Sequence, residues 1–266
     1  MKFNNTFWDR NPCGVEGNYL DRLYQRYSME PWLPELLKKI GTKGGQILEI
    51  GCGQGIDSME MAKYLHTGTI TSIDLSLKSL EIAKSDSIEL LVNKNISKDI
   101  IYINSDCESL PFPEDSFDVI YSMGVLHHTA NIENAISEIF RTLKPGGITY
   151  VALYRKFSLK VFIANIARKI AFSLGNTINN KFFVYEKLRQ FFSSHSRFGT
   201  MFHECFGVPI LNSYSKKDCI YLFSKQLEIL EIISIGPNLG MLSPFDGRKP
   251  SYWGYYWLLK AGKLNS

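Results

Sequence analysis

Apolar runs and helical repeats alternate through the middle of the chain. Five short apolar runs have the length and composition of buried strands; they lie at residues 46–50, 69–73, 100–103, 117–121 and 148–153. Between them, apolar residues recur at helical spacing over residues 57–65, 77–90 and 132–143. Strands that alternate with helices predict a parallel sheet covered by helices. Ligands of such sheets bind beyond the carboxyl ends of the strands, so the residues that follow each strand are the first candidates for a site.

The N-terminal segment predicts helices rather than strands. Residues 19–27 place apolar side chains on one helical face. A second helix is predicted from Ser28 to Ile40, with Ser28 as its N-cap and Pro31 in its first turn. Because this segment is rich in aromatic residues, we expect it to form a lid.

The C-terminal segment returns to a mixture of helix and strand. Ser215 suits the N-cap of a helix that runs to Phe223, and strands are predicted at residues 227–235 and 255–260. The predicted fold class is therefore α/β, with a seven-stranded, mostly parallel sheet and helices on both faces. Four regions are expected, namely an N-terminal helical lid, a core, a helical cap insert, and a C-terminal helix and strand pair that completes the core sheet, at residues 1–40, 41–155, 156–214 and 215–266.

Composition narrows the class of protein. Hydrophobic residues make up 45% of the chain, which supports a substantial core, and a net charge of +4 is too small to indicate a nucleic-acid partner. No stretch reaches transmembrane length without charges, so no integral membrane segment is expected. The absence of an apolar leader and of any C-x-x-C pair among five cysteines favours reduced thiols and a cytoplasmic location. Cys107, His203 and Cys205 lack a recognised metal-ligand spacing, so no metal is expected.

The most informative segment follows the first predicted strand. Glu49, Gly51, Gly53 and Gly55 stand at alternate positions, and a helical pattern begins directly after them. Alternate glycines let the backbone turn sharply and let a ligand press against the main chain. The N–H groups of this turn and the positive end of the next helix suit an anionic group. A dinucleotide fingerprint would place a third glycine where this chain has Ile56, and a tight turn without a ligand is the plainer alternative.

Candidate groups also follow the next three strands. Asp74 can accept from two hydroxyl groups, or it can stabilise the start of the next helix, although Ser76 is the better N-cap there. Asp106 is either a ligand acceptor or a solvated turn residue. His127 and His128 follow the fourth strand, where a histidine is a candidate base or positioning group, although a lone histidine is usually structural.

In order and spacing, these segments resemble the class I S-adenosylmethionine (SAM) methyltransferases. The similar motifs are E-x-G-x-G-x-G at residues 49–55, D-x-x-x-L-P-F-x-x-x-S-F-D at 106–118, G-V-L-H-H at 124–128 and L-K-P-G-G at 143–147. The resemblance spans residues 46–155. It implies a Rossmann-like fold and SAM as the cofactor, and it says little about the methyl acceptor.

The resemblance also implies roles for single residues. The glycine turn holds the amino-acid portion of SAM, and Glu49 helps to fix its ammonium group. Asp74 accepts both ribose hydroxyls, Leu75 packs on the adenine, and Asp106 accepts from the adenine amino group. The full cofactor-binding set expected is Tyr19, Glu49, Gly51, Cys52, Gly53, Gly55, Asp74, Leu75, Asp106, Cys107, Ser122 and Met123.

The acceptor site is predicted less sharply. Displacing a methyl group from a sulfonium needs alignment and exclusion of water more than acid–base groups, so we expect the lid and the insert to close the site. Residues 155–203 contain nine Lys or Arg and one acidic residue, which suits a helical cap, a pocket for an acidic or lipid-like acceptor, or a surface for an anionic membrane. The candidate catalytic residues are His127, His128 and Tyr24, and the candidate substrate-binding residues are Tyr27, His127, His203 and Tyr214.

Three functions stay open at this point. The first is methyl transfer to O, N or C of a small metabolite of amphipathic or acidic character. The second is methylation of a protein or peptide side chain. The third is a SAM-binding module without catalysis that regulates a partner. The sequence does not indicate an oligomeric state.

Overall fold

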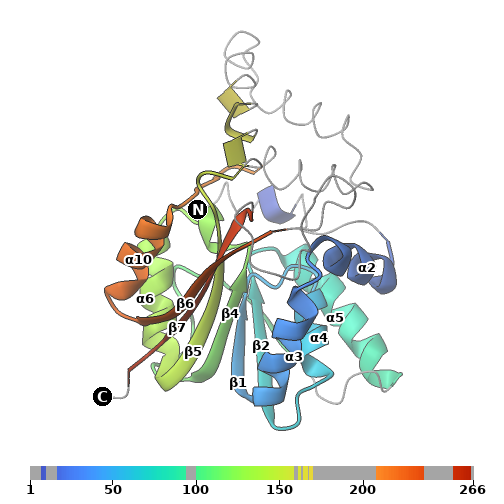
Figure 1. The fold of residues 1–266 in the computed structure, drawn as a ribbon. Coiled ribbons are helices and arrows are strands. Elements are labelled where there is room, and N and C mark those ends of the chain that lie inside the picture. Colours follow the sequence, from blue (N-terminus) through green and yellow to red (C-terminus); the bar gives the residue numbers. More distant parts are fainter. Residues whose placement is uncertain are drawn as a thin grey trace.

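The structure is a computed structural model that describes residues 7–9, 17–93, 100–158, 161–162, 164–166, 168–169, 208–236 and 254–264. Its centre is a seven-stranded sheet in the order β3-β2-β1-β4-β5-β7-β6 (Figure 1). The strands are β1 Gly45–Ile50, β2 Gly68–Asp74, β3 Ile100–Asn104, β4 Phe117–Met123, β5 Leu143–Tyr154, β6 Glu228–Ile235 and β7 Tyr256–Gly262. β1 to β5 pair in parallel, and β7 runs antiparallel to β5 and β6. The predicted α/β sheet is confirmed.

Helices cover both faces of the sheet (Figure 1). They are α2 Tyr19–Met29, α3 Leu33–Lys43, α4 Ile56–Ala62, α5 Leu77–Val92, the 3-10 helix η1 Leu126–His128, α6 Ile132–Thr142 and α10 Lys216–Ser224. Side chains alternate between the two faces along each strand. Ile47 and Val119 join a core with α3 and α4, whereas Leu48 and Ile120 join a second core with α6 and α10. Burial on both faces explains why these strands are almost continuously apolar.

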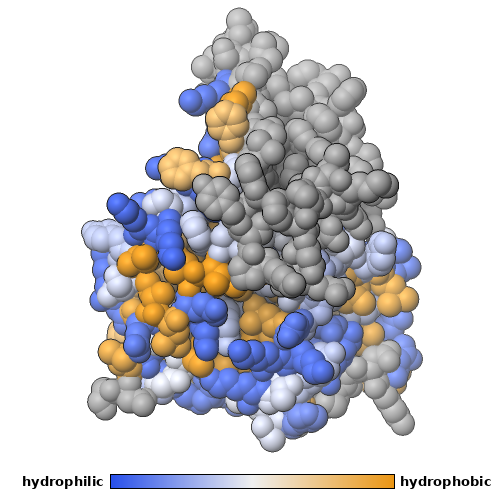
Figure 2. Space-filling model, viewed as in Figure 1, coloured by the Kyte–Doolittle hydropathy of each residue, from blue (hydrophilic) through white to orange (hydrophobic). Residues whose placement is uncertain are grey.

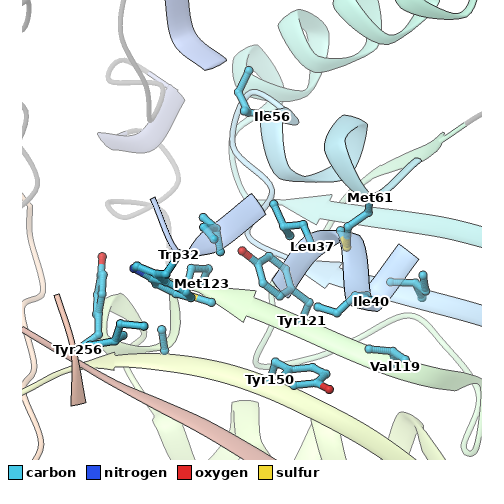
Figure 3. Packing of buried hydrophobic residues seen from close by; sticks show 14 of the residues in the cluster. Trp32, Leu37, Ile40, Ile56, Met61, Val119, Tyr121, Met123, Tyr150 and Tyr256 are labelled. Atoms are coloured by element: carbon cyan, nitrogen blue, oxygen red, sulfur yellow. The ribbon is translucent and has the colours of Figure 1, made fainter. Parts of the chain in front are cut away.

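The first core fixes the position of β4. Figure 3 shows Val119, Tyr121 and Met123 of this strand in the core that Leu37 of α3 and Met61 of α4 also line. Each of these side chains is at most 8% exposed. Full burial of an apolar side chain contributes about 1.5–3 kcal/mol before the entropy of ordering is subtracted. The carboxyl end of β4 is therefore a firm base for the residues that follow it.

Local signals predict some helix starts and miss one. The Ser76 hydroxyl accepts from the Ser79 N–H at 3.1 Å, and Ser215 forms a capping box at the start of α10. The predicted helix start at Ser28 is wrong. Ser28 lies in the last turn of α2, where its hydroxyl donates to the Gln25 carbonyl oxygen at 3.0 Å. The next helix, α3, begins only at Leu33, because the serine satisfies a carbonyl of the helix before it rather than capping the helix after it.

β5 also begins earlier than predicted, at Leu143 rather than Ile148. Leu143 pairs with Phe117, and the register then shifts before Val119 pairs with Ile148. The intervening turn includes Gly146, which has a φ of 73°. Residues 144–147 of the L-K-P-G-G motif therefore form an irregularity within the strand, shortly after the end of α6 at Thr142.

One edge of the sheet gathers the segments that carry candidate chemistry. The carboxyl ends of β1 to β5 lie there, at the upper edge of the sheet in Figure 1. Because β7 is antiparallel, its first residue, Tyr256, pairs with the last residue of β5, Tyr154. The C-terminal part of the chain thus reaches the same edge as the glycine turn.

Candidate functional site

The turn after β1 is shaped by its glycines. Gly51, Gly53 and Gly55 have positive φ values between 52° and 76°, a range that side chains disfavour. A Cβ atom at Gly51 would overlap Val125, and one at Gly55 would lie 2.8 Å from the Ala83 Cβ atom. Packing requires glycine at these two positions with or without a ligand, and the turn presents bare backbone before α4.

Asp74 joins this turn to the end of β2. Its Oδ2 atom accepts from the Gly53 N–H at 2.7 Å, and its Oδ1 atom accepts from the Ser76 N–H at 2.8 Å. Burial raises the pKa of the Asp74 carboxyl, and the two backbone donors oppose that rise. The Leu75 N–H also lowers this pKa. A carboxylate has about four acceptor positions, so acceptor capacity remains for a hydroxyl group of a ligand. The neighbouring Leu75 is half-buried, and its carbonyl oxygen accepts from Asn104 Nδ2 at 2.9 Å.

Glu49 lies on the α4 side of the sheet and is 2% exposed. Its Oε2 atom accepts from the Ser58 hydroxyl and, at 3.2 Å, from the Ser72 hydroxyl. Burial, followed by the charge of Asp57, raises the pKa of Glu49 to about 8. Its surroundings therefore favour the protonated form of this carboxyl in this state. Its contact with an ammonium group stays a prediction.

The residues after β3 form a turn fastened to the start of α6. Asp106 Oδ1 accepts from the Glu108 N–H at 2.9 Å. Glu108 Oε1 accepts in turn from the N–H groups of Ala130 and Asn131, at 2.8 and 3.0 Å. Between the two acids, burial and then the charge of Asp106 raise the pKa of the Cys107 thiol. Asp106 has the turn role that its sequence context suggests, and its contact with adenine stays a prediction.

The last residues of β4 are packed into the sheet. The Ser122 hydroxyl is fully buried and donates to the Ile50 carbonyl oxygen at 3.2 Å. Met123 joins the core beside α3. Both side chains are thus placed by the neighbouring strand and helix, and their part in cofactor binding stays a prediction.

A group of aromatic rings lies where β4, β5 and β7 meet. His127 is fully buried, with 3.8 Å between its ring centroid and that of Tyr154. Tyr154 stacks on Tyr256 at 5.2 Å, with 7° between the ring planes. His128 is half-buried, and its Nδ1 atom lies 2.7 Å from the Ile210 carbonyl oxygen. Such packing holds both imidazoles in fixed orientations, which suits positioning of a ligand.

Tyr256 is absent from the predicted site, although its hydroxyl lies near the end of β4. A Cβ atom at Gly124, directly after β4, would lie 3.2 Å from the Tyr256 hydroxyl oxygen. Nothing in the local pattern indicates this contact, because the position of β7 beside β5 decides it.

A buried polar network connects α2 to the start of α4. Asp57 Oδ2 accepts from Arg26 Nη2 at 2.9 Å and from the Tyr121 hydroxyl at 2.7 Å. Arg26 Nη1 lies 2.7 Å from Glu30 Oε2, and Glu30 Oε1 accepts from the Tyr255 hydroxyl at 3.0 Å. Asp57 and Tyr121 are also absent from the predicted site. The position of Asp57 directly after the glycine turn is the signal that could have identified it.

The predicted lid and pocket residues have different surroundings. The Tyr27 hydroxyl donates to Asp57 Oδ1 at 3.4 Å, so it joins the network, and Tyr19 is half-buried. Tyr24 is 74% exposed, so a catalytic role for it would require α2 to move. The Tyr214 carbonyl oxygen accepts from Trp257 Nε1 at 3.0 Å, and burial raises the pKa of the Tyr214 hydroxyl to about 12. His203 lies outside the described residues.

Two buried hydrogen-bond acceptors lie close to the glycine turn and Asp74. Within the described part of the chain, Asp9 Oδ1 and Gln54 Oε1 are buried without a hydrogen-bond donor. After burial, the charge of Asp9 also contributes to the raised pKa of Asp74. Unsatisfied buried acceptors beside carboxylates suit a ligand that carries donors and positive charge, and they disfavour a pyrophosphate.

Comparison with known proteins gives a family match over the core. Residues 48–151 match a family described as methyltransferase domain. Over 115 residues the chain is 33% identical to a sterol 24-C-methyltransferase of Gibberella zeae, covering 42% of this chain and 29% of the relative. Over 109 residues it is 28% identical to a phthiotriol/phenolphthiotriol dimycocerosates methyltransferase of Mycobacterium tuberculosis, covering 41% of this chain and 37% of the relative. The chain thus spans well under half the length of either relative.

A solved structure resembles the chain over nearly its whole length. It is a chain from the complex between the Haloferax volcanii Trm112 methyltransferase activator and a methyltransferase, with a TM-score of 0.62 and 15% identity. The match covers 99% of this chain and 98% of the solved chain. At that identity the likeness concerns the fold alone.

Proposed function

We propose that this chain, whose core belongs to the class I SAM-dependent methyltransferases, transfers a methyl group from SAM to an O, N or C atom of a small amphipathic acceptor. The observation that carries the proposal is the contact between the glycine turn and Asp74 at the carboxyl ends of β1 and β2. There Asp74 holds the backbone of the glycine turn and keeps acceptor positions for a donor-rich cation.

The residues present fit this cofactor. SAM, when bound, supplies an electrophilic methyl group on a positively charged sulfur. We assign the remaining acceptor positions of Asp74 to the ribose hydroxyls, and the buried Asp9 and Gln54 oxygens to other donors of the cofactor. Glu49 is the group assigned to the ammonium, and that contact would favour its ionised form.

The aromatic group beside β4 is assigned to the acceptor. His127, Tyr154 and Tyr256 form a rigid wall that aligns the acceptor and excludes water, which is where most of the rate enhancement would arise. His128 is the better candidate for a proton acceptor. Its Nδ1–H donates to the Ile210 carbonyl oxygen, so the lone pair of the neutral ring is on Nε2.

An amphipathic acceptor is the class that the observations favour. The two curated relatives are named for sterol and phthiotriol substrates. The first insert residues also combine aromatic, aliphatic and basic side chains. Peptide methylation and SAM binding without catalysis are the alternatives that an experiment must separate.

Release of S-adenosylhomocysteine, measured by mass spectrometry, tests the proposal. The full chain is incubated with SAM and, separately, with lipid extracts, water-soluble metabolites and peptides. We expect release with the lipid fraction. Release with peptides alone would support methylation of a protein or peptide. Bound SAM without release in any fraction would support a SAM-binding module without catalysis.

A matched pair of variants tests the assignment of the proton acceptor. His128→Gln should lower the release at least about tenfold, because it removes the group placed near the acceptor. His66→Gln, at an exposed position before β2, should leave the release of S-adenosylhomocysteine unchanged. Equal effects of the two changes would remove His128 from the mechanism.

A further inference from the structure

The first part of the insert has an apolar surface that no described residue covers. Phe157 is 76% exposed, Phe162 is 60% exposed and Ile166 is 44% exposed. Lys156 and Lys169 are exposed beside them. We call these five residues the insert surface. Figure 2 shows apolar and basic side chains next to one another on the part of the molecule that rises above the sheet.

The helical residues between 161 and 169 are apolar on two sides. Val161 and Ala164 are fully buried and join the core beside α3. Phe162 and Ile166, four residues apart, lie on one face of the helix and point outward, together with the exposed Lys169. The inner side therefore explains the folding of this helix, and the outer apolar side implies a second partner.

Charge identifies the kind of partner. Residues 155–203 contain nine Lys or Arg and one acidic residue. A basic segment is attracted to anionic lipid head groups, and exposed aromatic side chains enter the boundary between head groups and acyl chains. None of the helices in the described part of the chain could span a bilayer.

The insert surface is also connected to the candidate site. Arg168 donates to the carbonyl oxygens of Val208 and Pro209, at 2.7 and 3.3 Å. Shortly after these residues, the Asn212 N–H donates to the His127 carbonyl oxygen at 2.9 Å. A surface resting on a membrane would thus lie one short segment from the end of β4, where an acceptor dissolved in the bilayer could enter.

We propose that Phe157, Phe162 and Ile166, together with Lys156 and Lys169, dock the protein on the surface of an anionic lipid bilayer. The docking goes beyond methyl transfer and does not depend on it. Binding to vesicles in the absence of SAM therefore tests it separately from the proposed function.

Co-sedimentation of the full chain with vesicles is the test. Phosphatidylcholine vesicles are compared with vesicles that also contain phosphatidylglycerol, at low and high salt. We expect binding to the anionic vesicles that weakens as salt rises. Phe162→Ser combined with Ile166→Ser should lower the partition coefficient about tenfold.

Two matched controls separate docking from general stickiness. Ile88 and Val92 are 52% and 73% exposed on α5, also four residues apart, and their change to serine should leave binding intact. Lys156→Glu with Lys169→Glu should weaken binding, whereas Lys39→Glu with Lys84→Glu, at exposed positions elsewhere, should have a much smaller effect. Failure of the unchanged protein to prefer anionic vesicles, or equal losses in variants and controls, would overturn the proposal.

Discussion

Asp74, which is half-buried, and Glu49, which is buried, are carboxyl groups on neighbouring strands with different surroundings. Asp74 accepts from two backbone N–H groups, which stabilise its charged form against the cost of burial. Glu49 accepts from two side-chain hydroxyls and lies near the negative Asp57, so its neutral form is favoured. One edge of the sheet therefore has a charged acceptor and a carboxyl group that can lose its proton when a cation binds.

The raised pKa of Glu49 makes stability depend on pH. An unfolded glutamate titrates near about 4.3, whereas burial and Asp57 raise the folded pKa to about 8. Between these values the folded state binds a proton that the unfolded state has lost, so the free energy of unfolding falls as pH rises. Glu49→Gln removes this dependence, so the variant should gain stability relative to the unchanged protein between about pH 5 and pH 8.

Urea denaturation at several pH values measures this gain. Glu35→Gln, the same change at an exposed position, serves as the control and should follow the unchanged protein throughout. A constant difference between Glu49→Gln and the unchanged protein at all pH values would show that folding does not change the pKa of Glu49.

For single residues, the sequence predicts the positions of candidate ligand-binding groups better than it predicts their contacts. The glycine turn, Asp74 and Asp106 lie at strand ends as predicted, because motif spacing follows the alternation of strands and helices. Tyr121 and Tyr256 could not be chosen from the sequence, since their importance comes from contacts with Asp57 and with the end of β4. Those partners are distant in the chain.

Among elements, α2 is held by ion pairs as well as by apolar packing of Tyr19, Leu23 and Tyr27 against the first core. Its buried residues are Arg22 and Met29. Arg22 pairs with Asp86 of α5, and Arg26 pairs with Asp57 of α4. Because the apolar side chains of α2 other than Met29 are only partly buried, these ion pairs also contribute to its position. The Arg26–Asp57 pair also connects α2 to the residues directly after the glycine turn.

Replacing Arg26 should therefore lower the stability of the protein. Arg26→Ala would leave Asp57 and Glu30, which are 7% and 3% exposed as side chains, without their cation. We expect the free energy of unfolding to fall by about 3 kcal/mol, because uncompensated carboxylates would remain buried. Chemical denaturation measures the loss, and hydrogen exchange should show α2 opening first.

Lys225→Ala is the matched control for this change. Lys225 and Glu133 form an ion pair of 2.9 Å, the same length as the Arg26–Asp57 pair, but both side chains are exposed. Removal of this exposed ion pair should have no measurable effect on the free energy of unfolding. Similar losses for the two variants would mean that burial does not determine the strength of the Arg26 contact.

The whole molecule follows the predicted fold class, and the order of its last strands in the sheet is what the sequence leaves open. The sequence predicts seven strands and their mostly parallel arrangement, because each strand and helix has a local pattern. The place of β7 between β5 and β6 arises from pairing between residues far apart in sequence, such as Ile148 with Gly262. That pairing brings Tyr255 and Tyr256 to the candidate site.

Binding of SAM, measured by titration calorimetry on the full chain, tests the central claim most directly. We predict binding at one site, weakened at least about tenfold by Asp74→Asn, which removes a charged acceptor from the site. Asp118→Asn is the matched change and should leave the affinity unchanged. Asp118 also accepts from a backbone N–H, that of Gln46 at 2.7 Å, but it lies at the opposite edge of the sheet. Absence of binding by SAM and S-adenosylhomocysteine, or equal weakening by both substitutions, would contradict the account.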